Sequence, residues 1–210
     1  LNALKKDLNK PPTEAFFEII AIKQEIKLLQ KNLSKWIQPQ QINVPVSLKP
    51  ARASIIPDPL GCILIIGPWN YPFSLTLQPL VGALAAGNSA VLKPSEHAAN
   101  TSNLIKKLIN IYFPSNIVQV IEGDGTVASD LIKQNFDHVF FTGGETIGKK
   151  VMEAAAKNLT PVTLELGGKS PAIVIEGANL EITAKRLIWG KSLNAGQTCI
   201  APDHLLVKNK

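Results

Sequence analysis

Apolar side chains recur at spacings of three and four along a stretch near the start of the chain that is otherwise charged and polar. They are Ile19, Ile22, Ile26, Leu29, Leu33 and Trp36. This period is that of an α-helix with one buried face. It predicts a long helix that begins near Thr13, a candidate N-cap that follows two prolines, and ends near Ile37.

From Leu60 onward, short apolar runs alternate with helical patterns. The runs typical of strands buried on both faces lie at residues 61–66, 90–92, 117–121, 138–141 and 162–166. The patterns that predict helices lie at residues 74–86, 96–113, 126–133 and 146–157. Strands that alternate with helices form βαβ units, so we expect an α/β fold with a Rossmann-like parallel sheet and flanking helices. Ser95 is a candidate cap for the second of these helices.

Two regions stand outside this alternation. Residues 44–56 contain strand-like pieces separated by Pro45 and Pro50, which predicts extended edge strands. Residues 171–175, 180–192 and 205–208 predict a strand, a helix and a strand that begin a second α/β unit. If the chain stops at Lys210, we expect residues 205–208 to have no neighbouring strands and to expose an apolar edge.

Composition narrows the class of protein. The chain has 210 residues, of which 45% are hydrophobic and 18% charged, as in globular domains. No apolar run reaches the ~18 residues of a membrane span, and the first residues lack the order of a signal peptide. We therefore expect a soluble, cytoplasmic protein, with membrane association only if a carboxyl-terminal tail exists beyond Lys210.

The charge pattern bears on partners. The net charge is +6, and the first 35 residues hold seven lysines against four acidic residues. Four of these lysines recur every fourth residue and so share one helix face: Lys23, Lys27, Lys31 and Lys35. A solvated face is the simplest interpretation, although such a stripe can also meet nucleic acid or an anionic membrane. No aromatic residues interleave with the lysines, so we expect no nucleic-acid partner.

Cysteine and histidine usage indicates neither a disulfide framework nor a metal site. Cys62 and Cys199 lie far apart, and the three histidines are scattered without the spacing of metal ligands. A free thiol in a reducing compartment is the interpretation that remains.

A glycine-containing turn follows the predicted strand at residues 138–141 and opens a helix. Gly143, Gly144 and Gly148 lie in this turn and in the start of the helix. Glycine lets backbone amides approach a ligand, and a helix N-terminus favours phosphate. The turn is a candidate pyrophosphate site, but the spacing is not that of the GxGxxG fingerprint, and such glycines can be purely structural.

Two residues have side chains suited to covalent and acid–base chemistry. Glu165 ends an apolar strand, and a carboxylate in partly apolar surroundings can act as a base near neutral pH. Its alternative is a structural ion pair, with Lys169 as the candidate partner. Cys199 lies in a glycine-containing turn, where a thiol can be exposed and act as a nucleophile, although a lone cysteine is more often a buried apolar residue.

Further candidates follow two other strands. Trp69 and Asn70 come directly after the strand at residues 61–66, and an uncharged amide there can stabilise an oxyanion. Lys93 and Glu96 follow the strand at residues 90–92 and can hydrogen-bond sugar hydroxyls. Because the carboxyl ends of parallel strands meet at one edge of the sheet, these side chains are expected to gather there.

Taken together, these stretches resemble the aldehyde dehydrogenase superfamily. The matching stretches are PWNYPF, GNSAVLKPSE, FFTGGETIG, LELGGKSP and GQTC-APD, which span about Pro59 to Asp203. Within the superfamily, the sequences of these stretches are most similar to those of the class 3, or fatty aldehyde, branch. The combination is far more specific than any single motif.

The resemblance implies a role for each candidate. Cys199 matches the nucleophile, Glu165 the general base that activates water, and Asn70 the oxyanion donor. The positions that match cofactor contacts for NAD, with NADP left open, are Lys93, Glu96, Gly143, Gly144, Gly148 and Trp69. Many members have serine where this chain has Gly144, so a hydroxyl contact to the phosphates is missing. The resemblance further implies an NAD(P)-binding domain over residues 1–165 and the beginning of a catalytic domain over residues 166–210.

The resemblance also implies a small-molecule aldehyde substrate and a homodimeric full-length parent. Family members are more than twice as long, and this chain lacks the EIFGP-type stretch that holds the nicotinamide ribose. We therefore expect residues 1–210 alone to be weakly active or inactive. Alternatives are a non-catalytic dinucleotide-binding pseudoenzyme and an acyl-phosphate or acyl-CoA reductase, although the intact Glu165 argues against the reductase.

Overall fold

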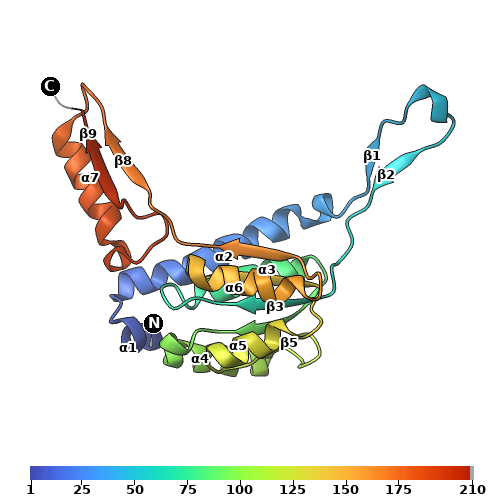
Figure 1. The fold of residues 1–210 in the computed structure, drawn as a ribbon, viewed down its shortest axis with the longest axis horizontal. Coiled ribbons are helices and arrows are strands. Elements are labelled where there is room, and N and C mark those ends of the chain that lie inside the picture. Colours follow the sequence, from blue (N-terminus) through green and yellow to red (C-terminus); the bar gives the residue numbers. More distant parts are fainter. Residues whose placement is uncertain (209–210) are drawn as a thin grey trace.

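A five-stranded parallel sheet forms the centre of the chain in a computed structural model that describes residues 1–208 (Figure 1). In spatial order its strands are β5 (Val118–Val120), β4 (Ser89–Lys93), β3 (Cys62–Ile66), β6 (His138–Thr142) and β7 (Val162–Glu165). This is the doubly wound order, in which the chain reverses direction across the sheet between β3 and β6. The predicted Rossmann-like fold is therefore confirmed.

The alternation of side chains along β3 assigns a helical layer to each face of the sheet. Ile63 and Ile65 pack in a core that includes Leu80, Ile105 and Ile109, which belong to α3 (Ser74–Ala85) and α4 (Ala99–Tyr112). Leu64 and Ile66 point to the other face, which α5 (Gly125–Ile132) and α6 (Glu145–Ala156) cover. Each fully buried aliphatic side chain contributes about 1.5–3 kcal/mol, so both faces help to fix the sheet.

Two helices precede the sheet. Helix α1 (Asn2–Leu8) was not predicted, and α2 (Pro12–Trp36) begins one residue before Thr13, so the N-cap prediction was wrong. Pro12 occupies the first helical position, where a proline loses no hydrogen bond. The four lysines of the α2 stripe are exposed, as expected of a solvated face.

A narrow hairpin projects from the body of the molecule (Figure 1). Strands β1 (Gln40–Ile42) and β2 (Ala53–Ile55) pair antiparallel, and a short 3₁₀ helix (Val46–Leu48) lies in their connection. Of the strands expected within residues 44–56, only β2 is present there, because β1 lies wholly before residue 44. Pro45 and Pro50 fall in the connection because a proline cannot donate to the strand ladder.

A second arm, which leaves the body near the end of β7, carries the last elements (Figure 1). It comprises β8 (Pro171–Val174), α7 (Leu180–Ser192), a 3₁₀ turn (Leu193–Gly196) and β9 (His204–Val207). The expectation that the last strand has no neighbour was wrong, because β9 pairs with β8 in parallel. Its four residues are nevertheless exposed. Among residues 1–208, no helix combines the length and the apolar character that crossing a membrane requires.

Candidate functional site

A broad cleft of about 1440 Å³ lies at the carboxyl ends of the central strands. Ligands bind at this edge in doubly wound sheets, where the strand order reverses. Eight of the nine candidate residues line the cleft: Trp69, Asn70, Lys93, Glu96, Gly143, Gly144, Glu165 and Cys199. The tertiary structure thus gathers residues that are far apart in sequence. The outermost two, Trp69 and Cys199, are separated by 130 positions.

Gly148 is the candidate that does not line the cleft. It lies buried in α6. A Cβ atom there would stand 2.8 Å from Leu166 Cδ2, closer than real side chains pack. The absence of a side chain lets α6 approach the residue that follows β7, so Gly148 contributes to the turn through its packing.

Lys93 and Glu96 form an ion pair at the end of β4. Their Nζ and Oε2 atoms are 2.6 Å apart, and the Lys93 side chain is only 3% exposed. Desolvation raises the pKa of Glu96, but the hydrogen bond and charge of Lys93 outweigh it and leave the pKa below its usual value. Between these residues Ser95 caps a 3₁₀ turn (Glu96–Ala98) rather than the α-helix itself. The pair presents a carboxylate acceptor and an ammonium donor, which suits sugar hydroxyls.

The turn at Gly143 and Gly144 is open toward the cleft. The Gly143 amide donates to the Glu165 carbonyl oxygen at 2.9 Å, and a Cβ atom at Gly143 would meet the Phe141 ring at 2.5 Å. A Cβ atom at Gly144 would meet nothing within 4 Å, and Gly144 is the N-cap of α6 with φ −78° and ψ 151°. A serine would therefore fit at Gly144, and α6 begins without a side-chain cap, which leaves its N-terminus suited to an anion.

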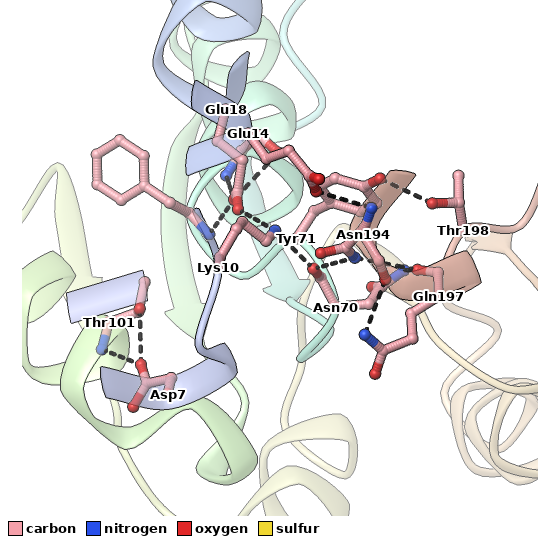
Figure 2. A network of polar contacts seen from close by, with 12 residues as sticks. Asp7, Lys10, Glu14, Glu18, Asn70, Tyr71, Thr101, Asn194, Gln197 and Thr198 are labelled. Carbon is pink, nitrogen blue, oxygen red and sulfur yellow. Dashed lines mark hydrogen bonds and ion pairs between the residues drawn. The ribbon is translucent and has the colours of Figure 1, made fainter. Parts of the chain in front are cut away.

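Asn70 is held by hydrogen bonds on both its side chain and its backbone. Its Nδ2 atom donates to the Gln197 carbonyl oxygen at 2.8 Å, and its own carbonyl oxygen accepts from Asn194 Nδ2 at 2.8 Å. A carboxamide has two N–H donors, so one remains for a ligand. Figure 2 shows Asn70 facing the turn that precedes Cys199.

Cys199 is exposed in a turn after α7. Asn194 and Ala195 take left-handed backbone conformations, with φ of 51° and 54°, and such conformations are costly for residues other than glycine. The hydroxyl groups of Tyr71 and Thr198 are 2.7 Å apart, which ties this turn to the loop after β3. Desolvation is the main reason that the pKa of Tyr71 is raised, so its phenol stays protonated.

Glu165 ends β7 next to Thr142 of β6. Glu165 is exposed, so its carboxylate is open to solvent. The alternative ion pair with Lys169 is not formed, because Lys169 Nζ lies 3.5 Å from Asp203 Oδ1. Glu165 is therefore an accessible carboxylate at the edge of the cleft.

Three residues that support the site were not predicted. Gly168 packs so closely on the Cys199 carbonyl oxygen that a Cβ atom there would overlap it. Lys10 and Asn194 both bind the Asn70 carbonyl oxygen. No local sequence pattern indicates a role for Lys10 or Asn194, since their hydrogen bonds to Asn70 cross 60 and 124 positions of sequence. Gly168 lies in the LELGGKSP stretch, which is the one signal that could have indicated it. Residues 1–208 contain no cluster of His, Cys, Asp or Glu that could hold a metal ion.

A sequence profile described as "Aldehyde dehydrogenase family" matches residues 2–210 of the chain. The chain is 49% identical over 208 residues to 4,4'-diaponeurosporen-aldehyde dehydrogenase of Staphylococcus aureus, covering 99% of the chain and 45% of that protein. It is 47% identical over 207 residues to aldehyde dehydrogenase family 3 member A2 of Pongo abelii, covering 98% and 43%.

Two further comparisons bear on cofactor and fold. The chain is 44% identical over 205 residues to a protein of Canis lupus familiaris named aldehyde dehydrogenase, dimeric NADP-preferring, covering 97% and 45%. The structure titled "Substrate bound state of Staphylococcus Aureus AldH" superposes with a TM-score of 0.96 at 47% identity, covering 99% of this chain and 46% of that one. The chain thus spans less than half the length of these relatives, and the resemblance to the class 3 branch is confirmed.

Proposed function

Because the chain belongs to the aldehyde dehydrogenase family, we propose that it carries the nucleophile, the base and most of the cofactor site of an NAD(P)-dependent oxidation of an aldehyde to a carboxylic acid. One observation supports this most directly: Cys199, Asn70 and Glu165 line the same cleft as Lys93, Glu96 and the Gly143–Gly144 turn. The proposal keeps the division into a cofactor domain, residues 1–165, and the start of a catalytic domain, residues 166–210.

In the first step, the Cys199 thiolate attacks the aldehyde carbon. A C–S bond forms and the carbonyl π electrons move to oxygen, which gives a thiohemiacetal oxyanion. The free N–H of Asn70 Nδ2 and the Cys199 backbone N–H stabilise this oxyanion. Such donors lower the barrier because they are already in place when the charge develops.

The second step releases the acid. A nicotinamide held in the cleft would supply the acceptor for the hydride of the thiohemiacetal carbon, and Cys199 would then carry the acyl group as a thioester. Glu165 then takes a proton from water, and the hydroxide attacks the thioester carbon. The C–S bond breaks, the carboxylic acid leaves, and the sulfur departs as the thiolate.

The residues present fit a dinucleotide. Lys93 and Glu96 would hold the adenosine ribose, and the backbone at Gly143 and Gly144 would hold the pyrophosphate, with Trp69 beside it. Gly148 supports this turn through its packing on Leu166. The Glu96 carboxylate, whose pKa is lowered, stays ionised and would repel a 2′-phosphate. We therefore propose NAD as the preferred cofactor. NADP stays open, because the canine relative is named NADP-preferring.

The proposal extends to partners and location. The class 3 likeness favours medium- or long-chain aliphatic or aromatic aldehydes as substrates. A dimeric relative favours a homodimer for the whole protein. A free, exposed thiol at Cys199 stays reduced most readily in a reducing compartment, which supports a cytoplasmic location.

A second candidate function is dinucleotide binding without catalysis. The observation in its favour is the exposure of Glu165 and Cys199 in an open cleft, where water is not excluded from the reacting groups. Binding of NAD without aldehyde turnover in the longest natural form of the protein would favour this candidate.

The nucleophile provides the decisive test. In the longest natural form of the protein, Cys199→Ala should reduce NAD(P)H formation from aldehydes to background while leaving NAD affinity, measured by calorimetry, within about twofold. Cys62→Ala is the matched control, because Cys62 begins β3 away from the cleft lining, and it should retain turnover. Turnover that survives Cys199→Ala would contradict the mechanism.

A further inference from the structure

A buried ion pair lies behind the loop that carries Asn70. Lys10 Nζ and Glu18 Oε1 are 2.7 Å apart, and each side chain is only 1% exposed. Lys10 lies in the turn between α1 and α2, and Glu18 lies on α2. Burying two charges gains little net stability compared with an apolar pair, so the other bonds that the pair makes are the informative feature.

Lys10 reaches the backbone of the candidate oxyanion donor. Its Nζ atom donates to the Asn70 carbonyl oxygen at 3.0 Å and stands 4.2 Å from the centroid of the Tyr71 ring. An ammonium group is a strong hydrogen-bond donor, and its cation–π contact adds a second direction of restraint. Lys10 therefore fixes the peptide that follows Asn70.

Glu18 holds the other end of the same loop. Its Oε2 atom accepts from the Phe73 and Ser74 backbone amides, both at 3.0 Å, and from Ser74 Oγ at 3.4 Å. These groups lie at the N-terminus of α3, where backbone donors lack partners within the helix. Glu18 therefore caps α3, and the pair holds residues 70–74 at both ends.

The turn before Cys199 also forms hydrogen bonds with Asn70. Asn194 Nδ2 and Lys10 Nζ share the Asn70 carbonyl oxygen, and Asn70 Nδ2 donates to Gln197 (Figure 2). The backbone N–H of Asn194 donates to Glu14 Oε2 on α2 at 2.7 Å. Helix α2 and Lys10 are thus bonded both to the loop of the oxyanion donor and to the turn of the nucleophile.

We propose that Lys10 and Glu18 are positioning residues that set the Asn70 amide relative to Cys199 by holding the loop between β3 and α3. The inference rests on the proposed function. The pair acts on the oxyanion only through Asn70, and substitutions at Lys10 and at Asn70 should therefore not be additive.

The test compares the parent protein with the double variant Lys10→Met, Glu18→Gln. Methionine and glutamine keep the shapes, and the glutamine Oε1 can still accept from the start of α3, so neither charge is left unpaired. Lys185→Met is the matched control, because Lys185 pairs with Glu181 at 2.6 Å on the exposed face of α7.

Two readouts are used, and neither requires turnover. The first is the NMR chemical shift and solvent exchange of the Asn70 side-chain amide. The second is the protection of Cys199 from alkylation by iodoacetamide when benzaldehyde or hexanal is added without cofactor, which reports thiohemiacetal formation. The double variant should shift the Asn70 amide signals and weaken protection by roughly tenfold, within the ~10²–10³ that a complete oxyanion donor supplies.

A double-mutant cycle that combines the double variant with Asn70→Ala separates a positioning role from a general loss of structure. Asn70→Ala should weaken protection, and adding the double variant should weaken it by less than about twofold more. Additive losses, or unchanged Asn70 signals with full protection in the double variant, would overturn the inference. If the double variant does not fold, Lys10→Met alone replaces it, because it removes the donor to the Asn70 carbonyl oxygen, and an unchanged Asn70 signal there has the same meaning.

Failure of the proposed function has a different signature. In that case aldehydes do not protect Cys199 even in the parent protein, whereas the Asn70 amide signals still respond to the double variant. The two readouts together therefore distinguish failure of the proposed function from failure of the positioning role.

Discussion

At Gly168 the loop after β7 meets the backbone of Cys199 so closely that a side chain has no room. We expect Gly168→Ala to push the Cys199 turn out of place. Since a displacement of about 1 Å can cost on the order of 10²-fold in rate, aldehyde turnover in the longest natural form should fall at least tenfold.

The neighbouring glycine provides the control for that substitution. A Cβ atom at Gly167 would meet nothing within 4 Å, so Gly167→Ala should keep turnover within about twofold. Steady-state kinetics with a fixed NAD concentration measures both variants. Equal activities for the two would show that the contact between Gly168 and Cys199 does not position the thiol.

Glu96 governs a second prediction at the scale of single residues. Because Lys93 keeps the pKa of Glu96 below its usual value, the carboxylate is charged throughout the range from about pH 6 to 8. The preference for NAD over NADP should therefore not change with pH in this range, and Glu96→Gln should reduce it about fivefold or more. Competition binding of the two cofactors measures this ratio, and an unchanged ratio in the variant would contradict a role for the charge.

At the scale of elements, α1 is joined to α4 by one carboxylate. Asp7 accepts four hydrogen bonds, from the backbone and side chains of Asn100 and Thr101 in the first turn of α4. It thus caps α4 from another helix. Asp7→Ala should lower the free energy of unfolding by about 1–2 kcal/mol, as the loss of an N-cap does.

The pH dependence of this contact has a definite sign. Desolvation raises the pKa of Asp7, but the four hydrogen bonds outweigh it and the pKa lies below its ordinary value. The contact should therefore stabilise the fold at and above about pH 4, and its contribution should disappear as the pH falls further. Thermal melts of Asp7→Ala should differ from the parent at pH 7 and converge with it near pH 2. Asp58→Ala, an exposed position, should match the parent throughout.

The elements themselves were largely predictable. The strands of the sheet and the helices between them follow from local periodicity, because burial on one or two faces imposes a period on the sequence. Helix α1 and the true start of α2 were missed. Neither helix begins with a side-chain cap: Leu1 precedes α1, and Pro11 occupies the N-cap position of α2.

At the scale of the whole molecule, two arms leave the sheet (Figure 1). Both carry exposed apolar side chains. On the arm of β8, α7 and β9, Ile173 is 68% and Trp189 is 66% exposed. Large exposed apolar surfaces favour association, and the chain spans less than half the length of its relatives. A purified chain of residues 1–210 should therefore self-associate at micromolar concentrations and oxidise aldehydes weakly.

Sedimentation velocity and a coupled NAD(P)H assay measure these two properties. Substitution of Trp189 and Ile173 by serine should reduce the self-association, since both side chains are exposed on this arm. A monomeric chain of residues 1–210 that turns over aldehydes at rates typical of whole enzymes would contradict the prediction.

The α/β class, the strands and helices of the central sheet and eight residues of the cleft follow from the sequence alone, because strand and helix periods are local and the carboxyl ends of parallel strands share one edge. The tertiary structure alone decided what holds those residues in place. The bonds of Lys10 and Asn194 to Asn70, the contact of Gly168 with Cys199 and the burial of Gly148 depend on segments that meet only after folding. Such contacts leave no period in the sequence, since each is a single meeting of two distant side chains or peptides.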